Sequence, residues 1–258
     1  MNKLFIFCTF SLLMSCSAIV NSYMKSMGIY DKEVKFEKMQ NTEKEVLFIS
    51  NRHMGTPVYY KNLRTAIDSL TNDGYFIFYE SVKPDVLENS DDTLQLMQQA
   101  LKLRKALGSS LSNISSDGGI FDTINHTMKV GKREIKLKEK IIMEPSAEKK
   151  GLVNNPNAEN TDVTLGAILN EYEKRFGEII LTDCDFNTPM NEPYHCENEN
   201  AAENRKKIYN EIIIDFRNQN LVNEVLESDK NKIVVIYGSN HIKGMKELLE
   251  QRGYQEIE

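Results

Sequence analysis

Two histidines stand at matching places near the two ends of this chain, each just after an apolar run. His53 follows Val46-Leu-Phe-Ile-Ser50-Asn51-Arg52, and His241 follows Ile233-Val-Val-Ile-Tyr-Gly238-Ser-Asn. A glutamate, Glu80, follows a third such run, Tyr75-Phe-Ile-Phe-Tyr79. Two His and one Glu form a catalytic zinc ligand set that leaves one position open for water. A divalent ion held there would lower the pKa of its water and polarise a carbonyl group.

These side chains must reach one place if they are to act together. In open α/β sheets, ligands bind beyond the carboxyl ends of the strands, and His53, Glu80 and His241 all stand where a predicted strand ends. We expect them to converge at that edge, with Asp183 as a further polar group after another predicted strand. The alternative is that strand ends carry polar residues because they surface there, where a His caps a helix and a Glu is solvated.

The pattern of strands and helices supplies such an edge. Short apolar runs predict strands at 45–50, 75–79, 178–182 and 232–238, and helical periodicity predicts helices at 58–72, 93–107, 163–176, 199–226 and after 238. The continuous apolar run at 75–79 is typical of a strand that is covered on both faces. Alternating strands and helices predict an α/β fold with a mixed, mostly parallel sheet and helices on both faces.

The α/β domain is expected to span 44–258. Within it, 108–143 has a weaker pattern, in which Met128-Lys-Val130-Gly131-Lys132-Arg133-Glu-Ile-Lys-Leu137 predicts a hairpin. This part is therefore expected to be a small hairpin-containing insertion or cap. Residues 145–162 are polar, with Asn-Asn-Pro-Asn at 154–157, and predict a loop.

The first residues have the pattern of a lipoprotein signal peptide, predicted at 1–15. Lys3 precedes an apolar stretch at 4–14 that is too short to span a bilayer. Leu13-Met14-Ser15-Cys16 then resembles a bacterial lipobox, which implies acylation of Cys16 and a lipid anchor at the bacterial cell envelope, on the periplasmic or cell-surface side. The alternative is an ordinary cleaved signal with a chance Cys. The polar segment 16–43 is interpreted as anchor and tether.

Two cysteines remain for the folded part, because Cys8 leaves with the signal and Cys16 takes the lipid. Cys184 and Cys196 flank a proline-containing loop. An even pair in an exported protein suggests a disulfide, with Cα atoms within about 7 Å of each other. The alternatives are two free thiols, or a soft metal site completed by His195.

Charge and composition narrow the classes of partner. The net charge of −6 and the pI near 5.4 give no electrostatic support for a nucleic-acid partner. The sequence contains neither a Gly-rich phosphate loop nor a Ser nucleophile elbow. The expected partners are a small-molecule or peptide substrate and, through the lipid anchor, the membrane.

The last strand-to-helix junction resembles a known family. Gly238-Ser-Asn-His241-Ile-Lys-Gly244, with Arg252-Gly253-Tyr254 after it, is similar to the C-terminal signature of the TraB family, which includes the TIKI proteases and is related to the erythromycin esterases and the ChaN-like haem-binding proteins. The family pattern has two Gly-x-x-His motifs, a Glu after the second strand and an Arg on the helix before the last strand. The residues that match these places are His53, Glu80, Arg205 and His241, with Ser50 where the family has its first Gly.

This resemblance implies a metal-dependent hydrolase that cuts a peptide or ester bond. His53, His241 and Glu80 would hold a divalent metal ion or its water, with Glu80 also catalytic, and Arg205 would orient the carboxylate or stabilise the oxyanion. The second interpretation is a non-catalytic haem- or iron-binding lipoprotein on the same scaffold. Convergence of the three ligands on one point favours the hydrolase, whereas a broad apolar cleft with an axial ligand favours the binding protein.

Overall fold

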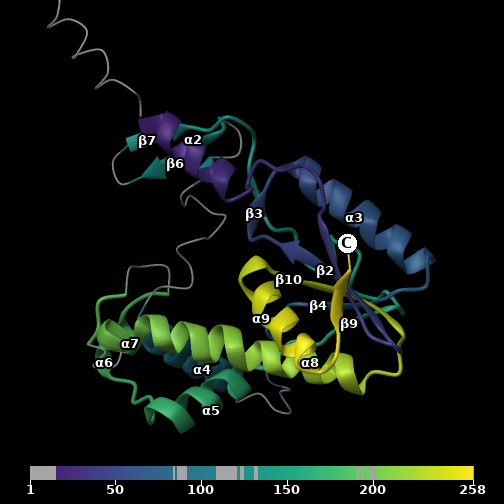
Figure 1. Ribbon diagram of the computed structural model, residues 1–258. Helices are drawn as coiled ribbons and strands as arrows, with labels where there is room; N and C mark the ends of the chain where they lie inside the picture. Colours follow the sequence, from purple (N-terminus) through teal and green to yellow (C-terminus); the bar gives the residue numbers. More distant parts are fainter. Residues whose placement is uncertain are drawn as a thin grey trace, which may run out of the picture.

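The predicted fold class is confirmed: the protein is α/β, with a mixed, mostly parallel six-stranded sheet and helices packed around it (Figure 1). The computed structural model describes residues 16–83, 85, 92–108, 121–122, 125–130, 133–190, 192, 194–197 and 201–257. The signal peptide predicted at 1–15 lies outside the described residues. Cys16 begins the first described helix, and its side chain is not described.

The sheet has its parallel strands in the middle. In order across the sheet the strands are β11 (Gln255–Ile257), β1 (Phe36–Gln40), β2 (Glu45–Asn51), β10 (Lys232–Gly238), β4 (Phe76–Tyr79) and β9 (Ala158–Asn160). The strands β2, β10, β4 and β9 are parallel to one another, and β1 pairs antiparallel with β2 and β11. The carboxyl ends of β2, β10 and β4 therefore meet at one edge.

The central strand β10 is buried on both faces, which explains its continuous apolar sequence. Val235 and Tyr237 pack with α8 (Phe216–Glu227) and α9 (Ser239–Glu250). Val234 and Ile236 pack on the other face with α3 (Pro57–Asn72). Thr56 caps α3 by accepting a hydrogen bond from the Tyr59 amide at 3.1 Å, which fixes where the chain turns after β3 (Met54–Gly55).

The strand predicted at 178–182 is wrong, because this segment pairs with no strand in the described part of the chain and leads into α6 (Asp183–Asn187). Ile179 packs instead into a separate apolar cluster around α5 (Leu165–Phe176), while Ile180 is exposed. The strand that pairs with β4 at this side of the sheet is instead β9, which lies inside the loop predicted at 145–162. Asp183 consequently starts a helix and does not stand at the sheet edge.

The predicted hairpin is confirmed. β6 (Thr127–Val130) and β7 (Arg133–Lys136) pair antiparallel, and β5 (Phe121–Asp122) adds a third strand. The chain then returns to the main body through β8 (Ile142–Met143), which pairs antiparallel with β3. This pairing ties the end of the insertion to the segment that carries His53.

The tether predicted for 16–43 is wrong for most of its length. The helix α2 (Cys16–Ser26) lies against the hairpin, with Met24 and Ile29 buried beside Leu137. Farther along, β1 is a strand of the main sheet. Within the described residues, no helix has both the length and the apolar character needed to cross a bilayer. The folded domain therefore begins close to Cys16, well before residue 44.

Candidate functional site

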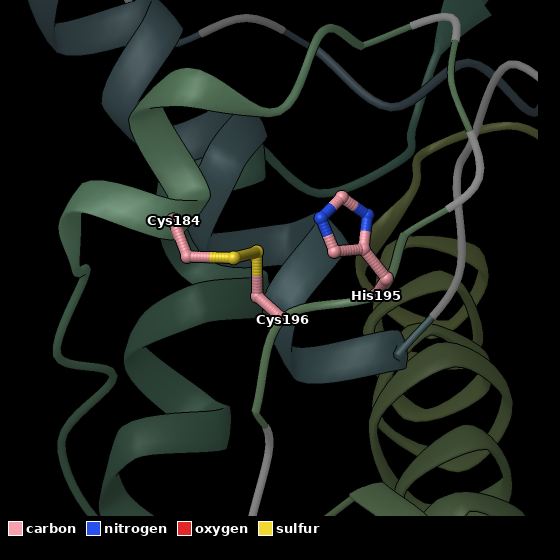
Figure 2. A group of neighbouring side chains, drawn as sticks. All are labelled: Cys184, His195 and Cys196. Atoms are coloured by element: carbon pink, nitrogen blue, oxygen red, sulfur yellow. A yellow bond between two sulfur atoms is a disulfide. The ribbon is translucent and has the colours of Figure 1, made fainter.

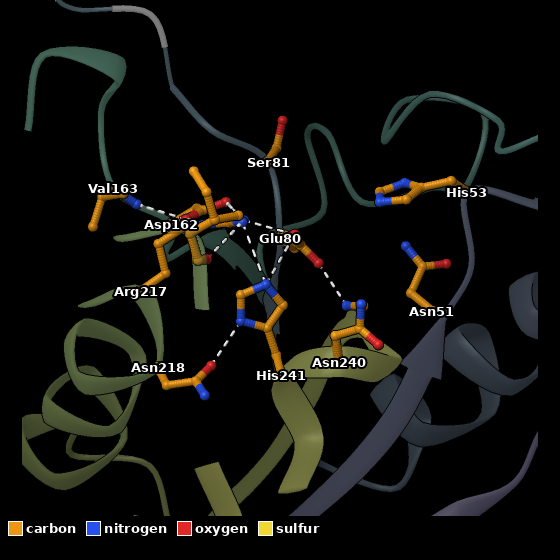
Figure 3. A network of polar contacts seen from close by, with 12 residues as sticks. Asn51, His53, Glu80, Ser81, Asp162, Val163, Arg217, Asn218, Asn240 and His241 are labelled. Carbon is orange, nitrogen blue, oxygen red and sulfur yellow. Dashed lines mark hydrogen bonds and ion pairs between the residues drawn. The ribbon is translucent and has the colours of Figure 1, made fainter. Parts of the chain in front are cut away.

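Glu80 and His241 meet at the carboxyl edge of the sheet, as predicted (Figure 3). Glu80 directly follows β4, and His241 lies in the first turn of α9, directly after β10. Because β4 and β10 are parallel neighbours, their ends deliver both side chains to one place. His241 Nε2 lies 3.7 Å from Glu80 Oε1.

The arginine of this site is Arg217, and the prediction of Arg205 is wrong. Arg217 Nη2 lies 2.6 Å from Glu80 Oε1. Arg217 also donates two hydrogen bonds to Asp162, from Nε to Oδ1 at 2.9 Å and from Nη2 to Oδ2 at 2.6 Å. Arg205 lies on α7 (Ala201–Ile208), where it donates to the Gly108 carbonyl at 3.0 Å. Arg217 follows Ile212-Ile-Ile-Asp215-Phe216, and no motif or periodicity in the sequence marks it.

A π-helical segment sets the position of Arg217. The segment η2 (Tyr209–Asp215) lies between α7 and α8. π-Helical segments are rare in proteins, and those that do occur are often at functional sites. The Ile213 carbonyl of this segment accepts a hydrogen bond from Arg217 Nη1 at 3.5 Å. Because the π segment changes the register of the helix, Arg217 and its neighbour Asn218 both reach the site.

His241 is a neutral imidazole with both ring nitrogens engaged. Arg217 Nη1 lies 3.3 Å from Nε2 and can only donate, so Nε2 is the acceptor. The ring proton is therefore on Nδ1, which donates to Asn218 Oδ1 at 2.7 Å. Burial and then the charge of Arg217 lower the pKa of His241 to about 4. The Tyr237 ring packs nearly perpendicular to the imidazole, with ring centroids 5.7 Å apart.

Glu80 is held as a carboxylate. Its Oε2 accepts a hydrogen bond from the Gly238 amide at 2.5 Å, and its Oε1 accepts one from Arg217. Burial acts to raise the pKa of Glu80, but Arg217, His241 and the Gly238 amide outweigh it, so the pKa lies below its usual value. Both carboxylate oxygens are thus fixed by protein donors.

His53 belongs to a second, more exposed group at the same edge. Its side chain is 72% exposed, and Nδ1 lies 3.2 Å from Glu144 Oε2. Glu144 directly follows β8, and its amide donates to the His53 carbonyl at 2.9 Å, so the β3–β8 pairing holds the two residues together. Figure 3 shows the imidazole directed toward the side of Glu80, with no contact drawn between them.

The charges around His53 favour its protonated form. The hydrogen bond to Glu144 raises the pKa of His53 above its ordinary value, and the Glu80 carboxylate adds to this effect. Glu144 also accepts hydrogen bonds from Asn51 Nδ2, at 2.6 Å, and from Lys150 Nζ. Burial acts to raise the pKa of Glu144, but these three donors outweigh it, so the pKa of Glu144 is lowered. Sequence reasoning missed Glu144, which no motif or periodicity marks.

The predicted metal centre of His53, His241 and Glu80 does not fit this geometry. The only lone pair on the His241 ring accepts the hydrogen bond from Arg217, so no ring nitrogen is left to bind an ion. Glu80 is likewise taken up by Arg217 and Gly238. Among the described residues, these three do not form a group with mutually close ligand atoms. In this arrangement the three side chains are engaged by protein partners, and their joint binding of a metal ion stays a prediction.

One group of close metal-ligating residues lies elsewhere, at Cys184, His195 and Cys196 (Figure 2). Their ligand atoms lie within 4.8 Å of one another. The two sulfurs form a disulfide with a Cα–Cα distance of 5.8 Å, which confirms the predicted pairing. Because metal binding requires thiolates, the group can hold an ion only if this bond is reduced.

The geometry explains both glycines of the motif Gly238-x-x-His241-x-x-Gly244. A Cβ atom at Gly238 would lie 3.2 Å from Glu80 Oε2, against the carboxylate that the amide binds. A Cβ atom at Gly244 would lie 2.5 Å from Asn218 Nδ2. The first glycine lets Glu80 approach the backbone, and the second makes room for the side chain that fixes the His241 tautomer.

Gly244→Ala should destabilise the protein by about 1–3 kcal/mol, because the new methyl group displaces Asn218. This sign is unusual, since Gly→Ala inside a helix ordinarily stabilises by roughly 0.5–1 kcal/mol. In an Asn218→Ala background the space is open, and the same change should recover the ordinary sign. Urea unfolding of the four proteins measures the coupling, and a stabilising Gly244→Ala in both backgrounds would contradict the explanation.

No family model, no curated protein and no solved structure matches this chain. The fold and the site therefore define the class by themselves. It is an α/β protein whose sheet carries, at its carboxyl edge, a buried Glu–Arg–Asp–His network beside an exposed His that is paired with a largely buried Glu.

Proposed function

We propose that this protein is a hydrolase on a TraB/TIKI-like scaffold that cuts an ester or peptide bond without a metal ion, attached to the bacterial cell envelope through an acylated Cys16. The observation that carries the proposal is the pair of His53 and Glu144, an exposed imidazole whose Nδ1 is held by a largely buried carboxylate. This is the arrangement of a general base with its orienting group. It stands beside Glu80, which is fixed by its own network.

The proposed chemistry uses side chains of the chain alone. Neutral His53 keeps its proton on Nδ1, toward Glu144, so Nε2 has a lone pair to accept a proton from water. The water attacks the carbonyl carbon of the substrate, and His53 then returns the proton to the leaving group. The Glu144 carboxylate stabilises the imidazolium ion that forms between these steps. The second hydrogen of the attacking water stays on the new hydroxyl group of the acid product, and Glu80 contributes its negative charge beside His53.

The polar surroundings of His53 support a hydrolase over the haem-binding alternative. The groups that act on its pKa are Glu144, Glu80 and Arg217, all of them charged. A haem site needs a broad apolar cleft around its axial ligand. An exposed imidazole among charged groups is suited to proton transfer instead.

The test is turnover by the full-length chain in detergent, with a panel of chromogenic esters and fluorogenic peptides, before and after removal of metal ions by dialysis against EDTA. We expect turnover of at least one substrate class, and we expect it to survive chelation. Activity that disappears on chelation and returns with Zn²⁺ would instead support a metal-dependent hydrolase. A chain that binds substrates of the panel without turning any of them over would support a binding protein.

The lipid anchor makes a separate prediction. Cys16→Ala should abolish incorporation of radiolabelled palmitate in bacterial cells, because the thiol of this residue is the acylation site. Cys8→Ala is the matched control and should keep its label, since Cys8 is removed with the signal peptide. Equal labelling of the Cys16→Ala protein and the unaltered chain would rule out the anchor.

A further inference from the structure

The loop 184–196, which the disulfide closes, is also held in place by contacts that do not involve sulfur. Arg104 of α4 (Asp92–Leu107) is fully buried and reaches into this loop. It donates to the carbonyls of Asp185 and Thr188, each at 2.9 Å. These bonds fix the first turn of the loop through its backbone, so its shape does not depend on the disulfide alone.

A second set of contacts ties the two ends of the loop to each other. Tyr194, which precedes His195, donates from its hydroxyl group to Asp185 Oδ1 at 2.6 Å. Asp185 directly follows Cys184, and its other carboxylate oxygen accepts a hydrogen bond from the Thr182 amide at 2.8 Å. The neighbours of Cys184 and of His195 are thus joined by bonds that remain when the two sulfurs are separated.

The ligand atoms at this loop have the spacing that a single metal ion needs. The sulfurs of Cys184 and Cys196 and a ring nitrogen of His195 lie within 4.8 Å of one another, and Figure 2 shows the imidazole beside the two sulfurs. Two thiolates on a tetrahedral zinc ion, with bonds of about 2.3 Å, place their sulfurs about 3.8 Å apart. The Cα–Cα distance of 5.8 Å allows this separation through rotation of the side chains, without a shift of the backbone.

We propose that the reduced chain binds one thiophilic metal ion, such as Zn²⁺, through Cys184, His195 and Cys196. Two thiolates and one imidazole are a known zinc ligand set that leaves a fourth position for water. Thiolates and imidazole favour Zn²⁺ and Cu⁺ over Mg²⁺ and Ca²⁺. The proposal depends neither on hydrolysis at His53 nor on the lipid anchor.

Binding of the ion requires a redox step and then the release of protons. A low-potential dithiol transfers two electrons and two protons to the S–S bond, which breaks into two thiols while the dithiol becomes a disulfide. The ion then replaces the two thiol protons, which pass to water, and the imidazole contributes a nitrogen lone pair. Because both bonds use the same two sulfurs, the loop holds either the disulfide or the ion.

The test uses the full chain with Cys8→Ala and Cys16→Ala, in which Cys184 and Cys196 are the only cysteines left. The chain is reduced with dithiothreitol, which is then removed without air. Co²⁺ should bind at one equivalent and give a thiolate-to-metal charge-transfer band, and Zn²⁺ should displace it. The unreduced chain should give no such band. The absence of the band after reduction, or an equal band without reduction, would overturn the proposal.

Replacement of His195 by Asn tests the third ligand. It should weaken Co²⁺ binding by about a hundredfold or more, because even the loss of an outer-shell partner costs about 10–100-fold in metal affinity. His126→Asn is the matched control, since His126 is not a member of the ligand group, and it should bind Co²⁺ like the unaltered chain. Equal affinities of the His195→Asn and unaltered chains would mean that the imidazole is not a ligand and would overturn the three-ligand site.

Urea unfolding shows whether the folded loop holds the ion. Zn²⁺ should raise the urea midpoint of the reduced chain, because an ion that binds the folded form stabilises it. The midpoint of the disulfide-bonded chain should not change, since its sulfurs are joined to each other. A reduced chain whose midpoint is unchanged or lowered by Zn²⁺ would mean that the thiols bind the ion from an unfolded loop, which would contradict a site built by the fold.

Discussion

Replacing Arg217 by Met should lower the free energy of unfolding by about 3–5 kcal/mol, because it leaves two buried carboxylates without their cation. The Asp162 side chain is fully buried, and Glu80 is 13% exposed. Arg217 binds both, and it also contacts His241 and the Ile213 carbonyl. Methionine has a similar apolar length, so the loss reports the uncompensated charges more than a cavity. Urea unfolding at pH 7 measures the change.

Arg205→Met is the matched control and should change stability by no more than about 0.5 kcal/mol, since its contact within the described residues is an exposed bond to the Gly108 carbonyl. The effect at Arg217 should also depend on pH. The folded-state pKa of Glu80 is lowered, so its stabilisation is present above the unfolded value of about 4.3 and is lost as pH falls through the folded value. The difference between the unaltered chain and Arg217→Met should therefore shrink in acid. Equal losses at the two arginines, or a difference independent of pH, would contradict the network.

The contrast between the two arginines shows where sequence reasoning stops. Both lie on the helical segment before the last strand, twelve positions apart. In a regular helix this spacing turns the side chain by roughly a third of a revolution, so a pattern that asks only for an arginine on that helix cannot choose between them. The π segment η2 sets which of the two arginines faces the sheet, and no periodicity in the sequence predicts this segment. Asp162, its main partner, lies two residues beyond the short strand β9.

The parts that were predictable have strong local signals. The strands β10 and β4 are continuous apolar runs, and their parallel pairing sends His241 and Glu80 to one edge. Short or long-range pairings lack such signals. β9 has three residues and no apolar run. Glu144 reaches His53 only because β8 pairs with β3 across about ninety residues of sequence.

The sequence pattern did not predict the helix α2 for a related reason. Its apolar residues divide between two sides, so the segment reads as a polar tether with scattered apolar positions. Val20 and Met24 pack against the hairpin, while Ile19 and Tyr23 remain exposed. Only the hairpin, more than a hundred residues later, provides the surface that makes this segment a folded element.

His53→Ala should lower turnover of any substrate found in the ester and peptide panel by about 10²–10⁴-fold, the usual contribution of a general base. The fold should be unaffected, because the side chain is largely exposed. His126→Asn is the matched control, since Asn also tolerates the positive φ of 56° at this hairpin position. Turnover by the control should match the unaltered chain, and an active His53→Ala protein would refute the assignment.

Glu144→Gln separates an orienting carboxylate from a merely structural one through the pH profile. The base must be neutral to accept a proton, so activity should rise with pH through the pKa of His53, which Glu144 raises above 6.5. Removing the negative charge lowers that pKa, so the acid limb of the profile should move to lower pH. The plateau rate should fall at the same time, because the imidazolium ion loses its stabilising partner. A reduced plateau with an unmoved acid limb would mean that Glu144 supports the fold and leaves the titration of His53 unchanged. An acid limb moved to higher pH would mean that the titrating group is not His53.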